Sequence, residues 1–296
     1  MLPSYIVLNG GFGNQLWQLA FAHKLAESRP VHLIKLQSDR IDSIHLDNGA
    51  ELISKIISHC SHRINFQTYN TANPFIRGKF IPESNWSRIW SRRIIDSRNL
   101  DWQEFEKIDT TGNFIHLGFF QSLKYLREEV MTVLKEMQRL IPSVRDLNRD
   151  YISQDYAILH LRGGDYYQDR HKNSFGVLDQ DYYVKLVQKI YSLGFEKAYV
   201  VTDDWKNARE RLKAIDRIEL MPLEGLSELA TMFSLSGAAV VGIANSSFSW
   251  WGGQLCKSNG GIVLAPNPWF RYQIGSGRVS DVFDSDTIKL SASFLD

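Results

Sequence analysis

Short apolar runs that alternate with helical periodicity constrain the fold of this chain more than any other feature. Residues 5–8 form a β-branched and aromatic run, a glycine turn follows at 10–13, and residues 14–28 repeat apolar side chains at helical spacing. Another apolar run at 31–34 completes the pattern. A strand, a tight turn, a helix and a second strand in this order predict a parallel α/β domain.

The second half of the chain starts the same pattern again. Strands are expected at 157–159, 197–201, 218–221, 238–243 and 261–264, and helices at 181–193, 207–214, 227–236 and 248–256, with Ser227 as a helix cap. A strand at 113–117 and a long helix at 122–140 precede a polar stretch at 145–153. We therefore predict two domains, residues 1–150 and 151–296, as the length of 296 residues also suggests.

Residues 36–112 are less regular, and only two helices are predicted there, at 51–58 and 100–107. Trp86 and Trp90 alternate with Arg88, Arg92 and Arg93. This basic, aromatic patch fits a contact with a carbohydrate acceptor. It equally fits an amphipathic helix that buries its tryptophans.

Charge and cysteine content exclude several classes of protein. The chain has 34 basic and 33 acidic residues, which argues against a nucleic-acid binder with a broad phosphate-neutralising surface. Two cysteines, Cys60 and Cys256, are too few for a disulfide framework and fit free thiols. No apolar run approaches about 20 residues. The N-terminus also lacks a basic region with a long apolar stretch behind it, so neither a transmembrane helix nor a signal peptide is expected.

Reactive side chains follow the predicted strand at 157–159. His160, Arg162 and Asp165 are spaced across the Gly163–Gly164 turn. Ligands of open α/β sheets bind at the carboxyl ends of the strands, so this stretch is a candidate site. The alternative is a strand end with ordinary solvated charges.

Two further strands end in polar clusters. Asn245, Ser246 and Ser247 open a helix, whose free N–H groups suit an anion that Arg162 would also bind. The alternative is a well-capped helix that buries Trp250 and Trp251. After the strand at 197–201, Asp203 and Asp204 either grip a ribose or the N–H edge of guanine, or cap the next helix.

The sequence gives little support to a dinucleotide cofactor such as NAD or to a bound metal ion. Gly11 and Gly13 begin a pattern like G-x-G-x-x-G, but Leu16 stands where its third glycine belongs, and no acidic residue closes the second strand. What remains is a turn that exposes Asn14, which suits the recognition of a hydroxyl or phosphate. Loose D-x-D pairs at 179–181 and 284–286 do not follow buried strands, so no metal is expected.

Three motifs in order, at 10–15, 160–166 and 245–251, resemble those of the bacterial and animal α-1,2-fucosyltransferases, of the family 11 type. The central motif of that family usually reads H-x-R-R-x-D-Y, and here Gly163 replaces the second arginine, while Arg162 remains. The resemblance runs from Gly10 to about Trp269.

This resemblance implies a fold and a reaction. The fold is α/β of the GT-B type, with two Rossmann-like domains facing a cleft, the first on the acceptor side and the second binding GDP-fucose. The reaction is a metal-independent inverting transfer of L-fucose from GDP-β-L-fucose to O2 of a terminal β-galactoside. With no membrane anchor in the sequence, we expect a bacterial enzyme in the cytoplasm or at the inner membrane that acts on precursors such as O-antigen repeat units.

The resemblance also implies roles for single residues. His160 and Asp204 lie near guanine, and Asn14 lies close to the reacting centre. From the residues themselves, Arg162 and the helix start at Ser246 and Ser247 are our choice for stabilising the leaving diphosphate. Asp165 is the first candidate for a base that accepts the proton of the attacking hydroxyl, unless the transition state needs none. His23 is the second candidate, and its alternative is a hydrogen-bonded core histidine. The full set of expected donor-binding residues is Gly13, His160, Arg162, Asp203, Asp204, Asn245, Ser246, Ser247 and Phe248.

Two other functions compete with this one. A different inverting fucosyltransferase would act on a protein hydroxyl or on N-acetylglucosamine. A sugar- or nucleotide-binding protein would show no turnover, although mere sugar binding does not require a guanidinium aimed at a diphosphate.

Overall fold

A computed structural model describes residues 3–37, 57, 63–70, 94–96, 115–140, 156–276 and 280–295. The chain divides into two units, residues 1–134 and 135–296, each with its own sheet. The division lies inside a helix, earlier than the boundary predicted at residue 150. Among the described residues, no helix is both long and apolar enough to cross a membrane.

The first unit is built on a five-stranded sheet in the order β3-β2-β1-β5-β4, and all its pairs are parallel. The predicted strand–turn–helix–strand opening is confirmed as β1 (Ser4–Leu8), α1 (Phe12–Ala26) and β2 (Val31–Gln37). The remaining strands are β3 (Ile64–Asn70), β4 (Ile94–Asp96) and β5 (Ile115–Leu117).

Helix α1 is the central helix of this unit, and every residue in it except Asn14 and Lys24 is buried. It begins at Phe12, two residues earlier than predicted, because the carbonyl of Gly11 already accepts the N–H groups of Asn14 and Gln15. Asn14 therefore lies in the first helical turn. This turn is placed where the loop leaves the carboxyl end of β1.

The prediction of one long helix at 122–140 is wrong for its first turns. A 3-10 turn, η2 (Leu123–Tyr125), is capped by Ser122 and ends at Leu126, whose backbone is extended with ψ of 132°. Helix α6 (Glu128–Leu140) starts only after this break. Apolar spacing continues across the break, so periodicity alone did not reveal it. The helices predicted at 51–58 and 100–107, the Trp86–Arg93 patch and Cys60 lie outside the described residues, apart from Ile57, which is helical.

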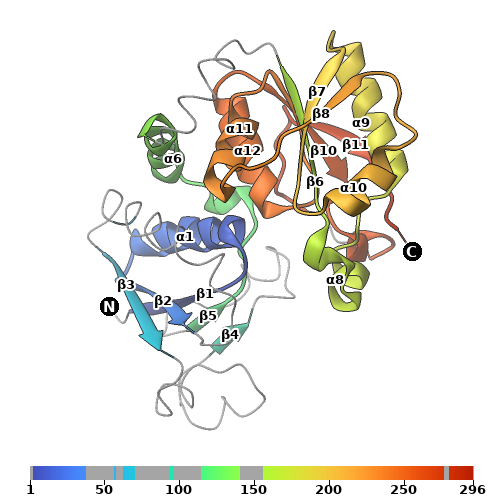
Figure 1. Ribbon diagram of the computed structural model, residues 1–296. Helices are drawn as coiled ribbons and strands as arrows, with labels where there is room; N and C mark the ends of the chain where they lie inside the picture. The colour runs from blue at the N-terminus through green and yellow to red at the C-terminus, as the bar shows by residue number, and fades with distance from the viewer. Residues whose placement is uncertain are drawn as a thin grey trace. The chain divides into compact units, whose positions relative to one another are not determined.

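The second unit is a six-stranded parallel sheet in the order β11-β10-β9-β6-β7-β8. Figure 1 shows helices on both of its faces, with α11 (Glu228–Ser236) and α12 (Ser247–Ser258) on one and α9 (Gln180–Ser192) and α10 (Trp205–Leu212) on the other. The strands are β6 (Ala157–Leu161), β7 (Lys197–Thr202), β8 (Glu219–Pro222), β9 (Val240–Gly242), β10 (Ile262–Asn267) and β11 (Ile288–Ser291).

Nearly all of these elements match the sequence prediction within three residues, and Ser227 caps α11 as expected by accepting the N–H of Ala230. The short helix α8 (Asp169–Ser174) and the edge strand β11 were missed. Their segments are short and mostly polar or half-buried, so they lack a clear apolar period.

Cys256 is fully buried, and burial raises the pKa of its thiol to about 12. An unreactive core thiol follows from this environment.

Candidate active site

The candidate site is the edge of the second sheet where β9, β6 and β7 end side by side. In the register of the sheet, Leu159 of β6 pairs with Gly242 of β9, and Leu161 pairs with Thr202 of β7. The polar clusters that follow these three strands therefore meet at one edge, as the sequence predicted from parallel strand ends.

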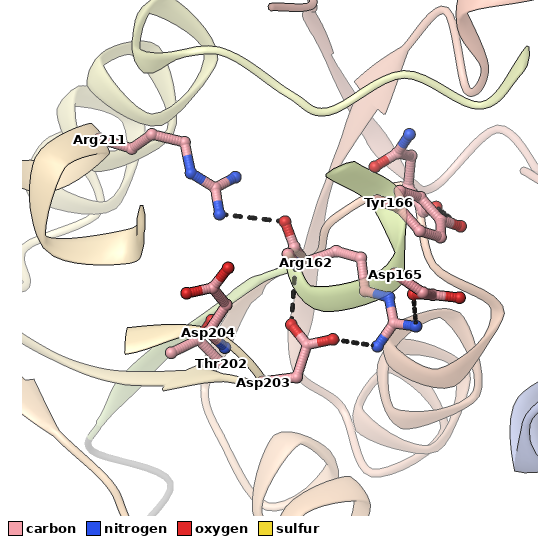
Figure 2. A network of polar contacts seen from close by, with 9 residues as sticks. Arg162, Asp165, Tyr166, Thr202, Asp203, Asp204 and Arg211 are labelled. Atoms are coloured by element: carbon pink, nitrogen blue, oxygen red, sulfur yellow. Dashed lines mark hydrogen bonds and ion pairs between the residues drawn. The ribbon is translucent and has the colours of Figure 1, made fainter. Parts of the chain in front are cut away.

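Arg162 follows β6 directly and is the central residue of this edge (Figure 2). Its Nη1 donates to Oδ2 of Asp203, and its Nη2 donates to Oδ1 of Asp165. The guanidinium also lies over the ring of Tyr166, 5.1 Å from its centroid, in cation–π contact. Its side chain remains about a quarter exposed, at 27%.

Asp203 is shared between the side chain and the backbone of the Arg162 loop. While Oδ2 accepts from Arg162, Oδ1 accepts the N–H of Gly163 at 2.8 Å. The structure thus makes Asp203 a partner of Arg162. Its predicted contact with guanine or ribose stays a prediction.

Asp204 caps α10, which was one of its two expected roles. Its Oδ1 accepts the N–H of Asn207 at 3.2 Å and its Oδ2 accepts the side-chain amide at 2.6 Å. These hydrogen bonds to Asn207 are the main reason that the pKa of the Asp204 carboxyl is lowered. Both carboxylate oxygens of Asp204 thus already have donors, and its guanine contact stays a prediction.

His160 is the last but one residue of β6 and is almost completely buried. Its ring lies 5.8 Å from that of Phe248 in the first turn of α12. Burial lowers its pKa to about 4, with Asp203 opposing the shift, so the imidazole is neutral at pH 7. Among the described residues its Nδ1 has no hydrogen-bond partner, and a neutral ring can place either a donor or an acceptor there.

The N-terminus of α12 presents free backbone donors. Ser246 is the cap residue, yet its side chain makes no capping hydrogen bond, and the first N–H that bonds back to it is that of Trp250. Ser247 and Phe248 are half-buried in the first turn, whereas Trp250 and Trp251 are core residues, as the alternative interpretation expected. Open N–H groups at a helix start are suited to an anion.

Asn245 has a structural contact that the sequence did not indicate. Its side-chain amide donates to the carbonyls of Phe175 and Gly176, at 3.1 and 2.9 Å, which holds the end of α8 against the loop before α12. Its carbonyl accepts the hydroxyl of Tyr166 at 3.0 Å. Tyr166 thus connects the Arg162 loop to the α12 loop.

Arg211 on α10 is a second residue that the sequence did not single out. It is buried, and its two terminal nitrogens donate to the carbonyls of Arg162, at 3.0 Å, and Leu178, at 3.3 Å (Figure 2). Its guanidinium also lies 5.4 Å from the ring centroid of Tyr183. Arg211 fixes the backbone from which the Arg162 side chain extends.

Three predicted residues, Gly13, Asn14 and His23, belong to α1 of the first unit. The side-chain oxygen of Asn14 accepts from Gln121 at 2.9 Å, so Gln121 orients the Asn14 amide. His23 is nine residues further along α1, about 13 Å from Asn14 along the helix axis. It is buried, and burial lowers its pKa. This burial favours the interpretation of His23 as a core histidine, although its Nε2 has no hydrogen-bond partner among the described residues.

The acidic pairs considered for a metal have local partners. Asp179 caps α9 by accepting the N–H of Tyr182. Asp284 forms an ion pair with Lys257 and accepts from Thr287. Within the described ranges, no group of three or more His, Cys, Asp or Glu side chains is arranged to hold a metal ion.

Two Rossmann-like units with parallel sheets, and an arginine at a strand end beside an open helix N-terminus, fit a glycosyltransferase fold of the GT-B type. The fucosyltransferase NodZ from Bradyrhizobium has this fold, with a TM-score of 0.50 and 15% identity over 86% of this chain and 93% of its own. The chain belongs to glycosyl transferase family 11, whose model matches residues 88–285. The resemblance found in the sequence is confirmed at this level.

Two relatives from Escherichia coli match along most of their length. The O-antigen biosynthesis glycosyltransferase WbnK is 24% identical over 90% of this chain and 94% of its own. An alpha-1,2-colitosyltransferase is 27% identical over 89% of this chain and 91% of its own.

Proposed function

We propose that this family 11 glycosyltransferase is an inverting α-1,2-fucosyltransferase that transfers L-fucose from GDP-β-L-fucose to O2 of a terminal β-galactoside, without a metal. The observation that carries the proposal is Arg162, a guanidinium at the end of a central strand beside the open N-terminus of α12. Membership of family 11 and the three sequence motifs support the sugar and the linkage.

The proposed reaction has three requirements at the edge of the second sheet where β9, β6 and β7 end. The galactose O2 attacks C1 of fucose, the bond from C1 to the phosphate oxygen breaks with its electron pair, and the proton of O2 passes to a base. Arg162 and the amides at the start of α12 stabilise the charge that gathers on the leaving GDP. Asp165 takes the proton, and His160 and Asp204 receive guanine.

Enzyme assay tests the proposal directly. The protein is incubated with GDP-fucose and lactose, with and without EDTA, and GDP release is followed together with the linkage of the trisaccharide. We expect Fuc-α-1,2-Gal in both mixtures and none with an acceptor that lacks the galactose 2-hydroxyl. Transfer only to N-acetylglucosamine or to a protein hydroxyl, or binding without turnover, would refute the galactoside assignment.

Arg162→Ala separates the diphosphate role from a structural one. We expect transfer to fall by about 100-fold or more, because a preorganised donor to the leaving group is lost. Arg217→Ala is the matched control, since Arg217 is exposed and lies over the ring of Tyr191. Near-normal kcat in Arg162→Ala, with circular dichroism unchanged in both variants, contradicts the role.

A second donor is favoured by one comparison. The 27% identical relative is named as an alpha-1,2-colitosyltransferase, and colitose differs from fucose by the absence of the 3-hydroxyl. Equal amounts of GDP-fucose and GDP-colitose in one mixture give the ratio of kcat/KM values. A ratio that favours colitose would change the donor but leave the linkage and the site. The name of the 24% identical relative, an O-antigen biosynthesis glycosyltransferase, also supports an O-antigen precursor as acceptor.

A further inference from the structure

The guanidinium of Arg162 forms ion pairs with two carboxylates. Asp203 accepts from Nη1 and Asp165 accepts from Nη2, so one positive charge faces two negative ones (Figure 2). The third nitrogen, Nε, is buried and has no hydrogen-bond partner among the described residues. A diphosphate that approached this arrangement would meet a net negative charge. Release of one carboxylate would remove this repulsion and leave an Nη of Arg162 open to an anion.

The two carboxylates are held very differently. Asp203 has a second anchor, the N–H of Gly163 at 2.8 Å, and a Cβ on Gly164 would lie only 2.8 Å from its Oδ2. Asp165 lies on the 3-10 turn η3 (Gly164–Tyr167), and its side chain is 46% exposed against 33% for Asp203. Among the described residues, Arg162 is the one side chain that donates a hydrogen bond to the Asp165 carboxylate.

Arg162 keeps its position without Asp165. Asp203 still binds Nη1, the ring of Tyr166 lies beneath the guanidinium, and the hydroxyl of Tyr166 is bonded to the carbonyl of Asn245. Arg211 holds the Arg162 carbonyl at 3.0 Å. Loss of the Asp165 contact thus frees Nη2 while the guanidinium plane stays where it is.

We propose that Asp165 is a displaceable counter-ion and Asp203 a permanent positioning residue. The diphosphate of the donor takes the place of Asp165 on Nη2, and a charge-assisted hydrogen bond to phosphate replaces an exposed ion pair. The proposal rests on the proposed function only in taking a nucleoside diphosphate as the ligand. It adds that the base candidate is released only in the donor complex.

Calorimetric titration with GDP tests this exchange. We expect Asp165→Asn to tighten GDP binding by about 2- to 5-fold, because an exposed ion pair no longer competes. Asp203→Asn should weaken it by about 10-fold or more, since a charged hydrogen bond that orients Arg162 is lost. Asp169→Asn makes the same change of charge four residues beyond Asp165, in the first turn of α8, and should leave affinity nearly unchanged.

Each outcome bears on one claim. GDP binding that is unchanged or weaker in Asp165→Asn overturns the exchange, as does equal tightening in Asp169→Asn, which would reflect net charge alone. Because Asp165 is exposed, this variant tests the exchange even if Asp203→Asn does not fold. Wild-type protein that binds no GDP refutes the donor assignment instead. Failure to fucosylate galactosides, with the GDP pattern intact, refutes only the acceptor and linkage.

Discussion

At the scale of residues, Gly163 explains why this chain departs from the usual H-x-R-R-x-D-Y motif. A Cβ at this position would lie 2.6 Å from the Cβ of Asp204 and 3.2 Å from its Oδ2. Because Asp204 is fixed by two hydrogen bonds to Asn207, it cannot easily yield. The space that a second arginine needs is already occupied by the cap of α10.

We therefore expect Gly163→Arg to harm the site although it restores the common motif. Overpacking should lower the free energy of unfolding by about 1–3 kcal/mol, and displacement of Asp204 and Arg162 should weaken GDP binding. Urea unfolding and GDP titration measure the two effects. Gly11→Ala is the control, because a Cβ there meets no atom within 4 Å. Tighter GDP binding in Gly163→Arg would show that the second arginine is accommodated after all.

The sequence predicted the members of the candidate site better than their partners. Arg162, Asp203 and Ser246 were placed at one edge because parallel strands end together. The pairing of Asp203 with Arg162 depends on side-chain directions across two strands, which no spacing reveals. Arg211 was missed because a buried arginine on α10 looks the same in sequence as its exposed neighbour Arg209. Gln121 was missed because it lies 107 residues from Asn14.

At the scale of elements, the packing of α12 on α11 depends on one of two adjacent glycines. A Cβ on Gly252 would lie 2.8 Å from Leu235 side-chain atoms and 3.2 Å from the carbonyl oxygen of Met232. A Cβ on Gly253 would be no closer than 3.4 Å to Ile243 and Val263, an ordinary contact. Gly252 is thus where the two helices approach closely.

This difference gives a matched pair of variants. Gly252→Ala should lower the free energy of unfolding by about 1–3 kcal/mol, because backbone atoms of α11 cannot move aside cheaply. Gly253→Ala should be neutral or stabilise by up to about 1 kcal/mol, since alanine favours a helix interior. Chemical denaturation of both proteins decides the matter. Equal changes in the free energy of unfolding in the two variants would contradict the inference that only Gly252 lies at the close contact between the helices.

Elements with a clear periodic spacing of apolar residues were predicted well, and elements without such a spacing were not. The buried strands β6, β7 and β9 and the helices between them follow from apolar runs and turns. The break before α6 depends on one extended residue, Leu126, that has no special sequence signal. Strand β11 is visible only from its pairing with β10, for example Leu264 with Ile288.

At the scale of the whole molecule, each unit contains a buried histidine that is neutral in the folded state. Burial lowers the pKa of His116 in the first unit to about 4, and does the same for His160 in the second. The unfolded chain titrates near 6.5, so below that pH it binds more protons than the folded protein. The stability present above pH 6.5 is therefore lost as the pH falls toward 4.

We expect urea unfolding to show a loss of about 2 kcal/mol for each histidine between pH 6.5 and 5. Carboxylates with lowered pKa values, such as Asp204, contribute mainly below this window. His116→Gln and His160→Gln should each remove part of the slope, and their effects should add because the residues lie in different units. An unchanged slope in both variants would mean that the histidines are not the groups that titrate.

The hydrogen bond from Tyr166 to the Asn245 carbonyl has a consequence for protein engineering. The phenol stays protonated, because burial raises its pKa, and its ring lies beneath Arg162. One side chain therefore connects the loops after β6 and β9. A chimera that exchanges one of these loops with a relative while keeping the other would break the connection. To transplant donor preference between such enzymes, both loops must be moved together.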